Sequence, residues 1–406
     1  MDFSFNLEKK DKKTQARAGI INTPHGKIKT PAFSPVATKA SVKGLTPNDL
    51  KETKSQVVLG NAYHLYLRPG TETIEKFGGF APFMGWNGPT ITDSGGYQVS
   101  FLFQKPFRER DRLAIQDRRR DEELSKVSIT DYGMYFRSHI DGGKQFISPE
   151  KSIEIQRTLG ADIIMAFDQP LSKGLTLAKK KEAIERTLKW EERSFKEWDK
   201  SGKKSIQGKY QALFGIVQGG TNRSLSRQSL KFILETGFPG IAVGGDAIGE
   251  DPKMTATALD TVSDQLPDDK PVHALGLGGG PEGVFEAVER GVDLFDNSSV
   301  TRMARTGLLF IYPEDGGNKQ NKFRINIEKS IYKDDKKPIS KICGCLTCRT
   351  FSKAYIHHLL VSDEPLGVRL TTIHNVYFYN DLMKKIRKTI LEDDFLSLKK
   401  YWIDSK

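Results

Sequence analysis

Short apolar runs alternate with amphipathic stretches along most of the chain. From about residue 56 onward, the apolar runs include SQVVLGNAYH, TITDSGG, ADIIMAFDQ, ALFGIVQGG, GIAVGGDAIGE, PVHALGLGGG and VDLFDNS. The stretches between them, such as SPEKSIEIQRTL and PEGVFEAVERG, repeat apolar residues at spacings of three to four, which is typical of helices. Strands that alternate with helices form parallel βαβ units, and these strands are apolar almost throughout. The pattern therefore predicts a parallel sheet that is covered on both faces.

The predicted strands end in glycine or polar residues. These strand-end residues are Asp93, Asp168, Gln218, Gly244, Gly245, Gly278 and Asp296. In a (β/α)8 barrel the active site is built from the C-terminal ends of several strands, so we expect an α/β fold of the (β/α)8 TIM barrel type. A doubly wound open sheet is the alternative, but the first predicted strand lacks the G-x-G-x-x-G fingerprint of that fold.

Several segments lie outside this alternation. Residues 1–20 are polar and basic, and the stretch GIINTPHGKIKTPAFSPVAT alternates like a β-hairpin. Residues 103–130 are highly charged and predict a surface excursion, whereas 314–338 form a polar linker ahead of the cysteines. No apolar run reaches the roughly 18 residues of a membrane helix, and the N-terminal residues lack the apolar core of a secretory signal. We therefore expect a cytoplasmic protein without a membrane partner.

Three cysteines lie within six residues and form a C-x-C-x2-C cluster: Cys343, Cys345 and Cys348. A secreted disulfide framework would spread an even number of cysteines along the chain, so this cluster indicates a reducing compartment and a metal. Three thiolates and one histidine make a closed tetrahedral site, which is typical of structural zinc. The candidate histidines are His357 and His358, in a helix-like run, and His374, at the end of the strand-like run VRLTTIH. Spacing alone does not choose among them.

The charge balance and two side-chain types suggest a nucleic-acid partner. The chain has 63 Lys and Arg against 51 Asp and Glu, and the resulting net charge of +12 favours a polyanionic partner. Tyr97 follows Asp93 closely and is either a stacking surface for a base or a core tyrosine. Arg302 and Arg305 follow Asp296 and either grip phosphates or belong to a solvated face.

The strand-end acids carry the candidate chemistry. Asp93, Asp168 and Asp296 are candidates for nucleophile, general acid or base, and hydrogen-bond acceptor. For any one of them the alternative is a helix N-cap, a position that Asp favours. Three acids at the strand ends of one predicted barrel favour a shared site over three separate caps. The glycine-rich turns after the strands could cradle a phosphate or a flat heterocycle, or could simply turn the chain tightly.

With these residues considered together, the chain resembles the tRNA-guanine transglycosylases of the bacterial queuosine type, the queuine tRNA-ribosyltransferases. The matching stretches run from about residue 15 to 385 and are NAYHLYLRPG, TDSGGYQV, FRSHIDGGKQFISPEKSIEIQ, LGADIIMAFD, GIVQGG, GIAVGG, GVDLFDNSSVTRMARTG, CGCLTCR and TTIHN. The resemblance implies an irregular (β/α)8 barrel as a single domain over 1–406, with a zinc-binding subdomain at about 315–385.

The resemblance also implies an activity. It is the exchange of guanine at the wobble position (34) of GUN-anticodon tRNAs, those for Asp, Asn, His and Tyr, for 7-aminomethyl-7-deazaguanine in queuosine biosynthesis. The reaction passes through a covalent aspartyl–ribosyl intermediate. The implied partners are the tRNA anticodon arm, the 7-deazaguanine base and a second copy of the chain in a homodimer. The implied cofactor is one structural Zn2+ per chain.

Compared position by position, the family's motifs imply a role for each candidate. Asp296 matches the nucleophile, and Asp93 matches the general acid/base. The residues that match base-binding positions are Asp168, Gln218, Gly245 and Tyr97. The residues that match the loop holding the anticodon are Arg302 and Arg305. The residues that match the zinc ligands are Cys343, Cys345, Cys348 and His374.

The sequence departs from the family pattern at positions expected to line the base pocket, namely Gln169, Pro170 and Asp246. These changes leave open a transglycosylase that uses a different 7-deazaguanine base. A second hypothesis is a non-catalytic tRNA-binding partner subunit, although such a protein should have lost its catalytic acids. A third is a zinc hydrolase on the same barrel, but the available histidines show no metal-binding spacing: His64, His139 and His273.

Overall fold

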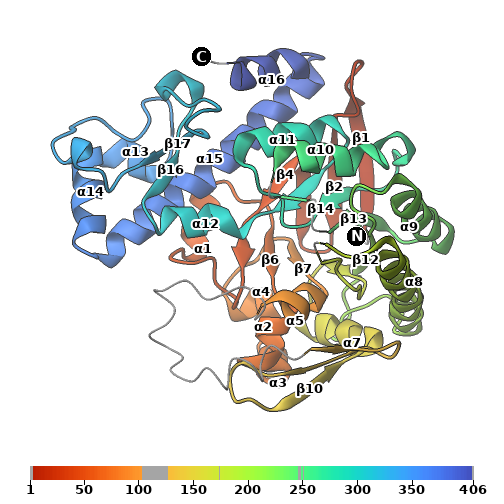
Figure 1. The fold of residues 1–406 in the computed structure, drawn as a ribbon. Helices are drawn as coiled ribbons and strands as arrows, with labels where there is room; N and C mark the ends of the chain where they lie inside the picture. The colour runs from red at the N-terminus through yellow and green to blue at the C-terminus, as the bar shows by residue number, and fades with distance from the viewer. Residues whose placement is uncertain (1–2, 103–126, 173, 246–247, 250, 405–406) are drawn as a thin grey trace.

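The computed structural model describes residues 3–102, 127–172, 174–245, 248–249 and 251–404. Its centre is a parallel sheet with the strand order β4-β15-β14-β13-β12-β11-β7-β6-β5 (Figure 1). The strands are β4 (Ala32–Ser34), β5 (Val36–Ala37), β6 (Val58–Gly60), β7 (Thr90–Thr92), β11 (Ile163–Met165), β12 (Ala212–Val217), β13 (Gly240–Val243), β14 (Val272–Ala274) and β15 (Leu294–Asp296). The two ends of the sheet, β4 and β5, are separated in the chain only by Pro35, so the sheet curls into a nearly closed barrel. The predicted (β/α)8 barrel is confirmed.

Burial on both faces explains why these short runs form strands although apolar and polar residues do not alternate along them. Every residue of β6, β7, β11, β12 and β13 is buried, as parallel strands are when helices cover the outside of a barrel and side chains fill its inside. The surrounding helices are α1 (Pro47–Glu52), α2 (Ala62–Leu67), α3 (Thr71–Lys76), α4 (Phe80–Phe83), α5 (Gly96–Phe101), α7 (Pro149–Leu159), α8 (Leu177–Lys200), α9 (Arg223–Thr236), α10 (Pro252–Asp260), α11 (Gly280–Glu289) and α12 (Ser298–Ala304). The helices expected from the apolar spacing of SPEKSIEIQRTL and PEGVFEAVERG are therefore confirmed as α7 and α11.

A three-stranded antiparallel sheet closes the end of the barrel opposite the strand-end acids. Its strands are β1 (Ser4–Lys10), β2 (Arg17–Thr23) and β3 (Gly26–Thr30). The expected hairpin is confirmed as β2 and β3, whereas β1 was not expected from its polar sequence. Ile21 and Ile28 belong to one buried apolar cluster with barrel residues such as Leu59 and Phe214. This sheet of β1, β2 and β3, which we call the lower sheet, therefore covers the interior of the barrel at the end opposite the acids.

Two further segments interrupt or extend the barrel. A small antiparallel sheet, β8 (Ser128–Ile129), β9 (Met134–Arg137) and β10 (Lys144–Ile147), precedes α7. Most of the charged excursion expected at 103–130 lies outside the described residues. After α12 come β16 (Leu308–Phe310), β17 (Arg324–Asn326), α13 (Leu346–Thr350), α14 (Lys353–Val361), α15 (Pro365–Leu391) and α16 (Phe395–Ile403). Among the helices that the structure describes, none has the length and apolar character needed to span a membrane.

The prediction of a strand ending at His374 was wrong, because VRLTTIH lies inside the 27-residue helix α15. The β-branched residues that suggested a strand are accommodated by local bonds, since the Thr371 and Thr372 hydroxyls donate to carbonyls of the preceding turn. Both threonines are buried, and so is one side of the helix along most of its length. Tertiary packing therefore overrides the intrinsic strand preference of this run.

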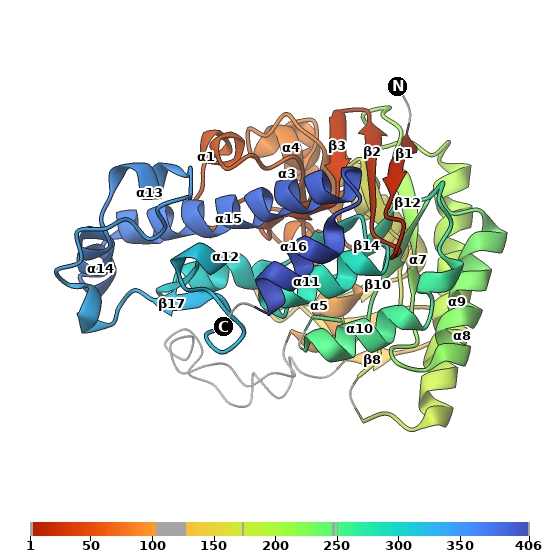
Figure 2. The same cartoon turned by 90° about the horizontal axis from the view of Figure 1, so that it is seen from above.

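Helix α15 connects the C-terminal elements to the barrel (Figure 2). Near its C-terminal end, Arg387 donates to the backbone carbonyls of Gly19 and Thr30 in the lower sheet. In its middle, the Tyr379 ring packs against Phe33 of β4 and Phe295 of β15, with ring centroids 5.1 and 6.3 Å apart. The helix thus lies over the seam at which β4 and β15 pair.

A buried ion pair joins the lower sheet to the barrel. The Arg17 guanidinium donates to both carboxylate oxygens of Asp293 at 3.1 and 2.6 Å, and the two side chains are 2% and 0% exposed. We expect Arg17→Ala to lower the free energy of unfolding by about 3–5 kcal/mol at neutral pH, because it leaves a buried carboxylate without its cation. Urea denaturation followed by circular dichroism measures this change.

The pH dependence of the same variant has a definite sign. Burial raises the pKa of Asp293, and the Arg17 charge opposes that rise. Without Arg17 the carboxyl takes up a proton more readily, so the destabilisation should shrink as the pH falls. Lys10→Ala, which removes an exposed ion pair with Asp268, is the matched control and should change stability by about 0–1 kcal/mol. Equal losses in the two variants would contradict this role for the buried pair.

Candidate functional site

The strand-end acids meet at one rim of the barrel because parallel strands direct their carboxyl ends to the same side. Asp93 follows β7 directly, Asp168 lies three residues beyond the end of β11, and Asp296 is the last residue of β15. Their charges interact: Asp296 acts on Asp93, and Asp93 acts on Asp168. The site therefore combines residues from separate strands, as the barrel hypothesis predicted.

Asp93 is held through both carboxylate oxygens. Oδ1 accepts the backbone N–H of Ala62 at 2.8 Å, while Oδ2 accepts the Gln98 amide at 2.8 Å and also the Asn61 amide. Burial, together with the charge of Asp296, raises the pKa of Asp93 to about 6 in spite of these donors. A fixed carboxyl with such a pKa can both give and accept a proton near neutral pH, which suits a general acid/base.

Asp168 and Gln218 form a second buried pair. The Gln218 amide donates to Asp168 Oδ2 at 2.7 Å, and the Ser94 hydroxyl donates to Oδ1 at 3.3 Å. Burial, with a contribution from the charge of Asp93, raises the pKa of Asp168 to about 6. The other amide atom of Gln218, Oε1, is buried and has no partner among the described residues. A buried acceptor without a donor fits a ligand that brings an N–H group.

Asp296 is held differently from Asp93. Its Oδ1 atom lies 3.0 Å from Nε2 of His273 and accepts the backbone N–H of Gly276 at 3.0 Å. Its side chain is 14% exposed, so it is open to a ligand at the rim. A partly exposed carboxylate that is bonded at only one oxygen among the described residues suits a nucleophile.

None of the three acids caps a helix, which was the alternative interpretation of the sequence. The N-caps of the helices that follow are Gly95 for α5, Thr176 for α8 and Asn297 for α12. Asn297 takes the capping role that Asp296 could have filled, because its side chain accepts from the Ser299 N–H at 2.8 Å. The acids are thus available for a ligand.

Gly245 lies just after β13, and Tyr97 lies four residues after Asp93. Gly245 has a φ of +112°, and a Cβ built there would be 3.4 Å from Gln218 Oε1, so only glycine leaves this approach to the amide open. The Tyr97 side chain is 54% exposed on the first turn of α5, and it contacts the Phe101 ring. The alternative of a core tyrosine is therefore excluded, whereas stacking on a base stays a prediction.

Positive charge gathers near α12. Burial lowers the pKa of Arg305, and the charge of Arg302 lowers it further. Burial also lowers the pKa of Lys43, with contributions from Arg305 and Lys39. These mutual effects place the four cations near one another, and such a cluster can bind phosphate groups. Sequence reasoning had named the two arginines and missed the two lysines.

The other residues missed by the sequence analysis hold the acids in place. They are Asn61, Ser94, Gln98, His273 and Gly276. Asn61 follows β6 directly, so the strand-end rule could have found it. Gln98 lies on the helix after Asp93, and His273 lies within β14, where nothing in a single sequence separates it from a core histidine.

A buried glutamate also supports the rim. Glu191 of α8 accepts the Ile216 backbone N–H at 2.5 Å with one carboxyl oxygen, and the other oxygen has no partner in the described part of the chain. Complete burial, with the charge of Asp168, raises the pKa of Glu191 well above its usual range.

Gln169, one of the positions that depart from the family pattern, is turned toward α8, because its Oε1 accepts from Arg186 at 2.7 Å. Asp246 lies outside the described residues.

The predicted metal cluster forms in the C-terminal elements. Its ligands are Cys343, Cys345, Cys348 and His374, all buried, with their ligand atoms within 4.8 Å of one another. Nδ1 of His374 lies 3.8, 3.6 and 3.3 Å from the three sulfurs in that order. A tetrahedral ion with bonds of about 2.3 Å to sulfur and about 2.0 Å to nitrogen would separate these atoms by about 3.5 Å. The residues therefore fit a four-coordinate metal ion.

The choice among the three candidate histidines follows from these contacts. Nε2 of His374 lies 2.7 Å from the Phe310 carbonyl, which orients the ring for a metal at Nδ1. Nδ1 of His357 instead lies 2.8 Å from the Ile327 carbonyl. Within the described residues, no further group of three or more potential ligands could hold a metal, so the zinc hydrolase hypothesis finds no site at the barrel rim.

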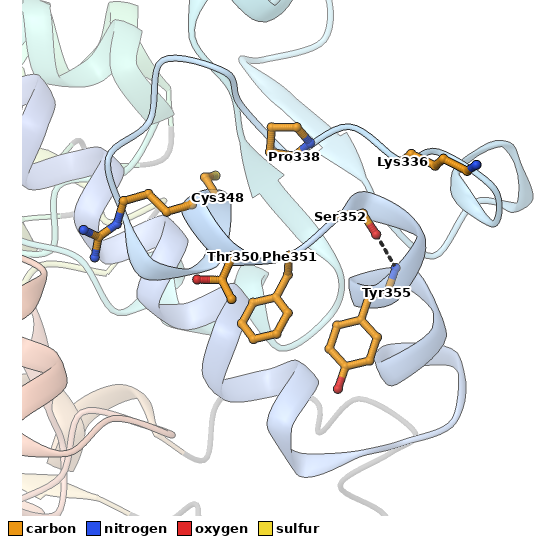
Figure 3. A pocket seen from close by; sticks show the side chains of 8 residues that line it. Lys336, Pro338, Cys348, Thr350, Phe351, Ser352 and Tyr355 are labelled. Carbon is orange, nitrogen blue, oxygen red and sulfur yellow. Dashed lines mark hydrogen bonds between the residues drawn. The ribbon is translucent and has the colours of Figure 1, made fainter.

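A surface cavity lies beside the metal cluster (Figure 3). It is lined by Lys336, Pro338, Cys348, Arg349, Thr350, Phe351, Ser352 and Tyr355 and has a volume of about 580 Å3. The Phe351 and Tyr355 rings stack with centroids 5.3 Å apart. None of the rim acids lines this cavity, so it is separate from the carboxylate site.

We expect His374→Ala to lose the bound metal, because it removes one of the four ligands. The wild-type chain should carry about one divalent ion, released when the thiols are modified in the presence of a colorimetric chelator. His357→Ala is the matched control, since that ring bonds a backbone carbonyl, and it should keep its metal. Metal retention by His374→Ala, or no metal in the wild-type chain, would contradict the assigned ligands.

Comparison with known proteins gives a consistent result. Residues 11–406 match the family model described as Queuine tRNA-ribosyltransferase. A relative with that name from Halothermothrix orenii is 42% identical over 401 residues, which cover 98% of this chain and 96% of the relative. Another from Desulforamulus reducens is also 42% identical, over 98% and 96% of the two chains. One from Roseiflexus sp. is 39% identical, over 99% and 100%.

Proposed function

The chain belongs to the queuine tRNA-ribosyltransferase family and is thus a pentosyltransferase, and we propose that it exchanges guanine at wobble position 34 of tRNA for 7-aminomethyl-7-deazaguanine. The proposed tRNAs are those with GUN anticodons, for Asp, Asn, His and Tyr. One observation carries the proposal: Asp93, Asp168 and Asp296 gather at one rim in three different hydrogen-bonding environments. Base exchange needs these three roles, which are an acid/base, a base-binding acceptor and a nucleophile.

The proposed chemistry uses Asp296 and Asp93 in turn. A carboxylate oxygen of Asp296 attacks C1′ of the ribose, the C1′–N9 bond of guanine breaks, and Asp93 gives its proton to the departing base. The incoming base then returns a proton to Asp93 and attacks C1′, and the bond to Asp296 breaks. Two inversions give net retention, as in retaining glycosidases. No outside oxidant or cofactor is needed for this balance.

Base recognition is proposed for the buried pair behind these two acids. Asp168 and the unpartnered Oε1 of Gln218 are acceptors that match the N–H groups on the pyrimidine edge of guanine and of 7-deazaguanines. Gly245 leaves room for a flat ring beside the amide, and the exposed Tyr97 ring is available to stack on it. Because Gln169 bonds Arg186, its side chain is not expected to contact the base.

RNA binding is proposed for the cations near α12. Arg302, Arg305 and Lys43 can contact phosphates of the anticodon arm, and the net charge of +12 favours this polyanion. The target nucleotide has to leave its stack to reach the buried acids. We propose a structural zinc ion, one per chain, for the Cys3His cluster, and from the family resemblance we expect a cytoplasmic homodimer.

The reaction is tested by release of labelled guanine from tRNA that carries it at the wobble position. We expect release with 7-aminomethyl-7-deazaguanine, and the 7-cyano analogue and queuine are tested in parallel to identify the preferred base. Asp296→Ala should abolish both release and any denaturation-resistant adduct with tRNA. Asp268→Asn removes an exposed acid from the opposite end of the barrel and should leave release unchanged.

Three outcomes would change the proposal. An adduct in Asp296→Ala means that the nucleophile is another residue. Release only with a different base supports the alternative base. Binding of tRNA without release by any of the three bases supports a non-catalytic partner subunit.

The two half-reactions should depend on pH in opposite directions. Departure of guanine needs protonated Asp93, so above its pKa of about 6 the rate of adduct formation should fall about tenfold per pH unit. Discharge of the adduct by an incoming base needs the ionised form, so that rate should rise through the same range. Single-turnover assays of each half-reaction measure both. Because the charges of Asp93 and Asp168 interact, the midpoint of this pH dependence is a property of the two carboxyl groups together.

The control for this assignment is the variant that cannot titrate. Asp93→Asn should be slow in both half-reactions and should lose both pH limbs, while tRNA affinity stays within about twofold of wild type. Opposite limbs that persist in Asp93→Asn would assign the proton to another group. Near-normal turnover would remove Asp93 from the acid/base role.

A further inference from the structure

His273 contacts the proposed nucleophile from inside the barrel. It is the middle residue of β14 and is 0% exposed, and its Nε2 atom lies 3.0 Å from Asp296 Oδ1. Its other ring nitrogen, Nδ1, is buried and has no partner among the described residues. Buried polar atoms usually have a hydrogen-bond partner. A buried histidine that contacts a rim acid through one ring nitrogen and has no partner at the other therefore needs an explanation.

The contact determines which ring nitrogen carries the proton. An ionised carboxylate can only accept hydrogen bonds, so Nε2 must donate to Asp296. A neutral imidazole has a single N–H, and Nδ1 is then left as a bare acceptor. Neither a donor nor an acceptor among the described residues bonds Nδ1, so the single N–H of the ring finds a partner only when it lies on Nε2.

The sheet makes this contact rigid. In the parallel ladder His273 pairs with Leu294, two residues before Asp296, so the two side chains come from neighbouring strands in fixed register. The Gly276 N–H donates to the same oxygen at 3.0 Å from the turn that follows β14. Two donors on Oδ1 fix the plane of the carboxylate. Oδ2 receives no hydrogen bond from the residues that the structure describes.

We propose that His273 is a positioning residue that holds the Asp296 carboxylate by an Nε2–H hydrogen bond to Oδ1 and so directs Oδ2 at C1′ of the ribose. This inference rests on the proposed function and deepens it, because it names the residue that aims the nucleophile. His273 does not touch the substrate. Its effect should therefore fall on the covalent step and not on RNA binding, and misalignment of a nucleophile by about 1 Å costs roughly 100-fold in rate.

Two amide variants of different length test the hydrogen bond. In His273→Gln the side-chain nitrogen can lie close to the position of Nε2, so the donor is kept. In His273→Asn the side chain is one methylene shorter and cannot reach Asp296. We expect His273→Asn to slow adduct formation about 10–100-fold in single-turnover assays with tRNA affinity within about twofold, and His273→Gln to recover most of that rate.

Equal rates of adduct formation in the two amide variants would overturn the proposal. They would show that the rate does not depend on whether the side-chain amide can extend to Asp296. A rate loss in His273→Asn that only parallels lost tRNA affinity would overturn it as well. The unfolding midpoint of each variant shows whether it folds. If His273→Asn does not fold, the proposal is tested by the rate of His273→Gln relative to wild type and by the spectroscopic measurement described next.

A spectroscopic measurement tests the hydrogen bond without the reaction. In the full-length protein labelled with 15N-histidine, the His273 signals, identified by their loss in His273→Gln, should show a protonated Nε2 and an unprotonated Nδ1. Asp296→Ala should shift the Nε2 signal. A protonated Nδ1, or no shift, would overturn the inference. Absence of guanine release in the wild-type chain counts instead against the proposed function, so the two failures are distinguishable.

Discussion

Closure of the parallel barrel is the constraint on which the rest of the structure depends. The sheet ends at β4 and β5, which only Pro35 separates, and the seam is the pairing of β4 with β15. Closure places residues from 61 to 296 on one rim, and the seam strand β15 itself ends in Asp296. Helix α15 covers this seam with Tyr379. The proposed nucleophile therefore lies on the strand that closes the barrel and that α15 packs against.

The rim acids are all aspartates, but they differ in hydrogen bonding and in burial. Asp93 is bonded at both oxygens and buried, so it is immobile and its pKa is raised to about 6. Asp296 is bonded at one oxygen only among the described residues, and the other oxygen is the one that the proposed reaction uses. Burying carboxylates opposes stability, and the core and the ion pair at the opposite end of the barrel offset this cost. The proposed difference in role between Asp93 and Asp296 thus follows from hydrogen-bond geometry and not from residue type.

The sequence was sufficient for the features that depend on local pattern. Unbroken apolar runs, helical spacing and polar strand ends predicted the barrel and placed Asp93, Asp168 and Asp296 on it, and the tight spacing of the cysteines predicted the metal cluster. The hydrogen bonds to the acids left no such signal. Gln98 bonds Asp93 from the following helix and His273 bonds Asp296 from the neighbouring strand, yet both look like ordinary helix and strand residues. The run VRLTTIH near the start of α15 was misjudged because its β-branched residues favour a strand locally, whereas burial against the seam favours a helix. Those preferences are decided by long-range packing, which a single sequence does not display.

Helix α15 makes the metal cluster matter beyond its own surroundings. His374 is a ligand, and the next residue, Asn375, bonds the backbone of β16 and the Val300 carbonyl of α12, the helix that carries Arg302. Without a bound ion, three thiols and a buried imidazole have little reason to stay together, and the helix loses its anchor at that end. In a living cell, a shortage of the metal would then be seen as faster proteolysis and lower abundance of this protein, even though the proposed base exchange uses carboxylates and no metal.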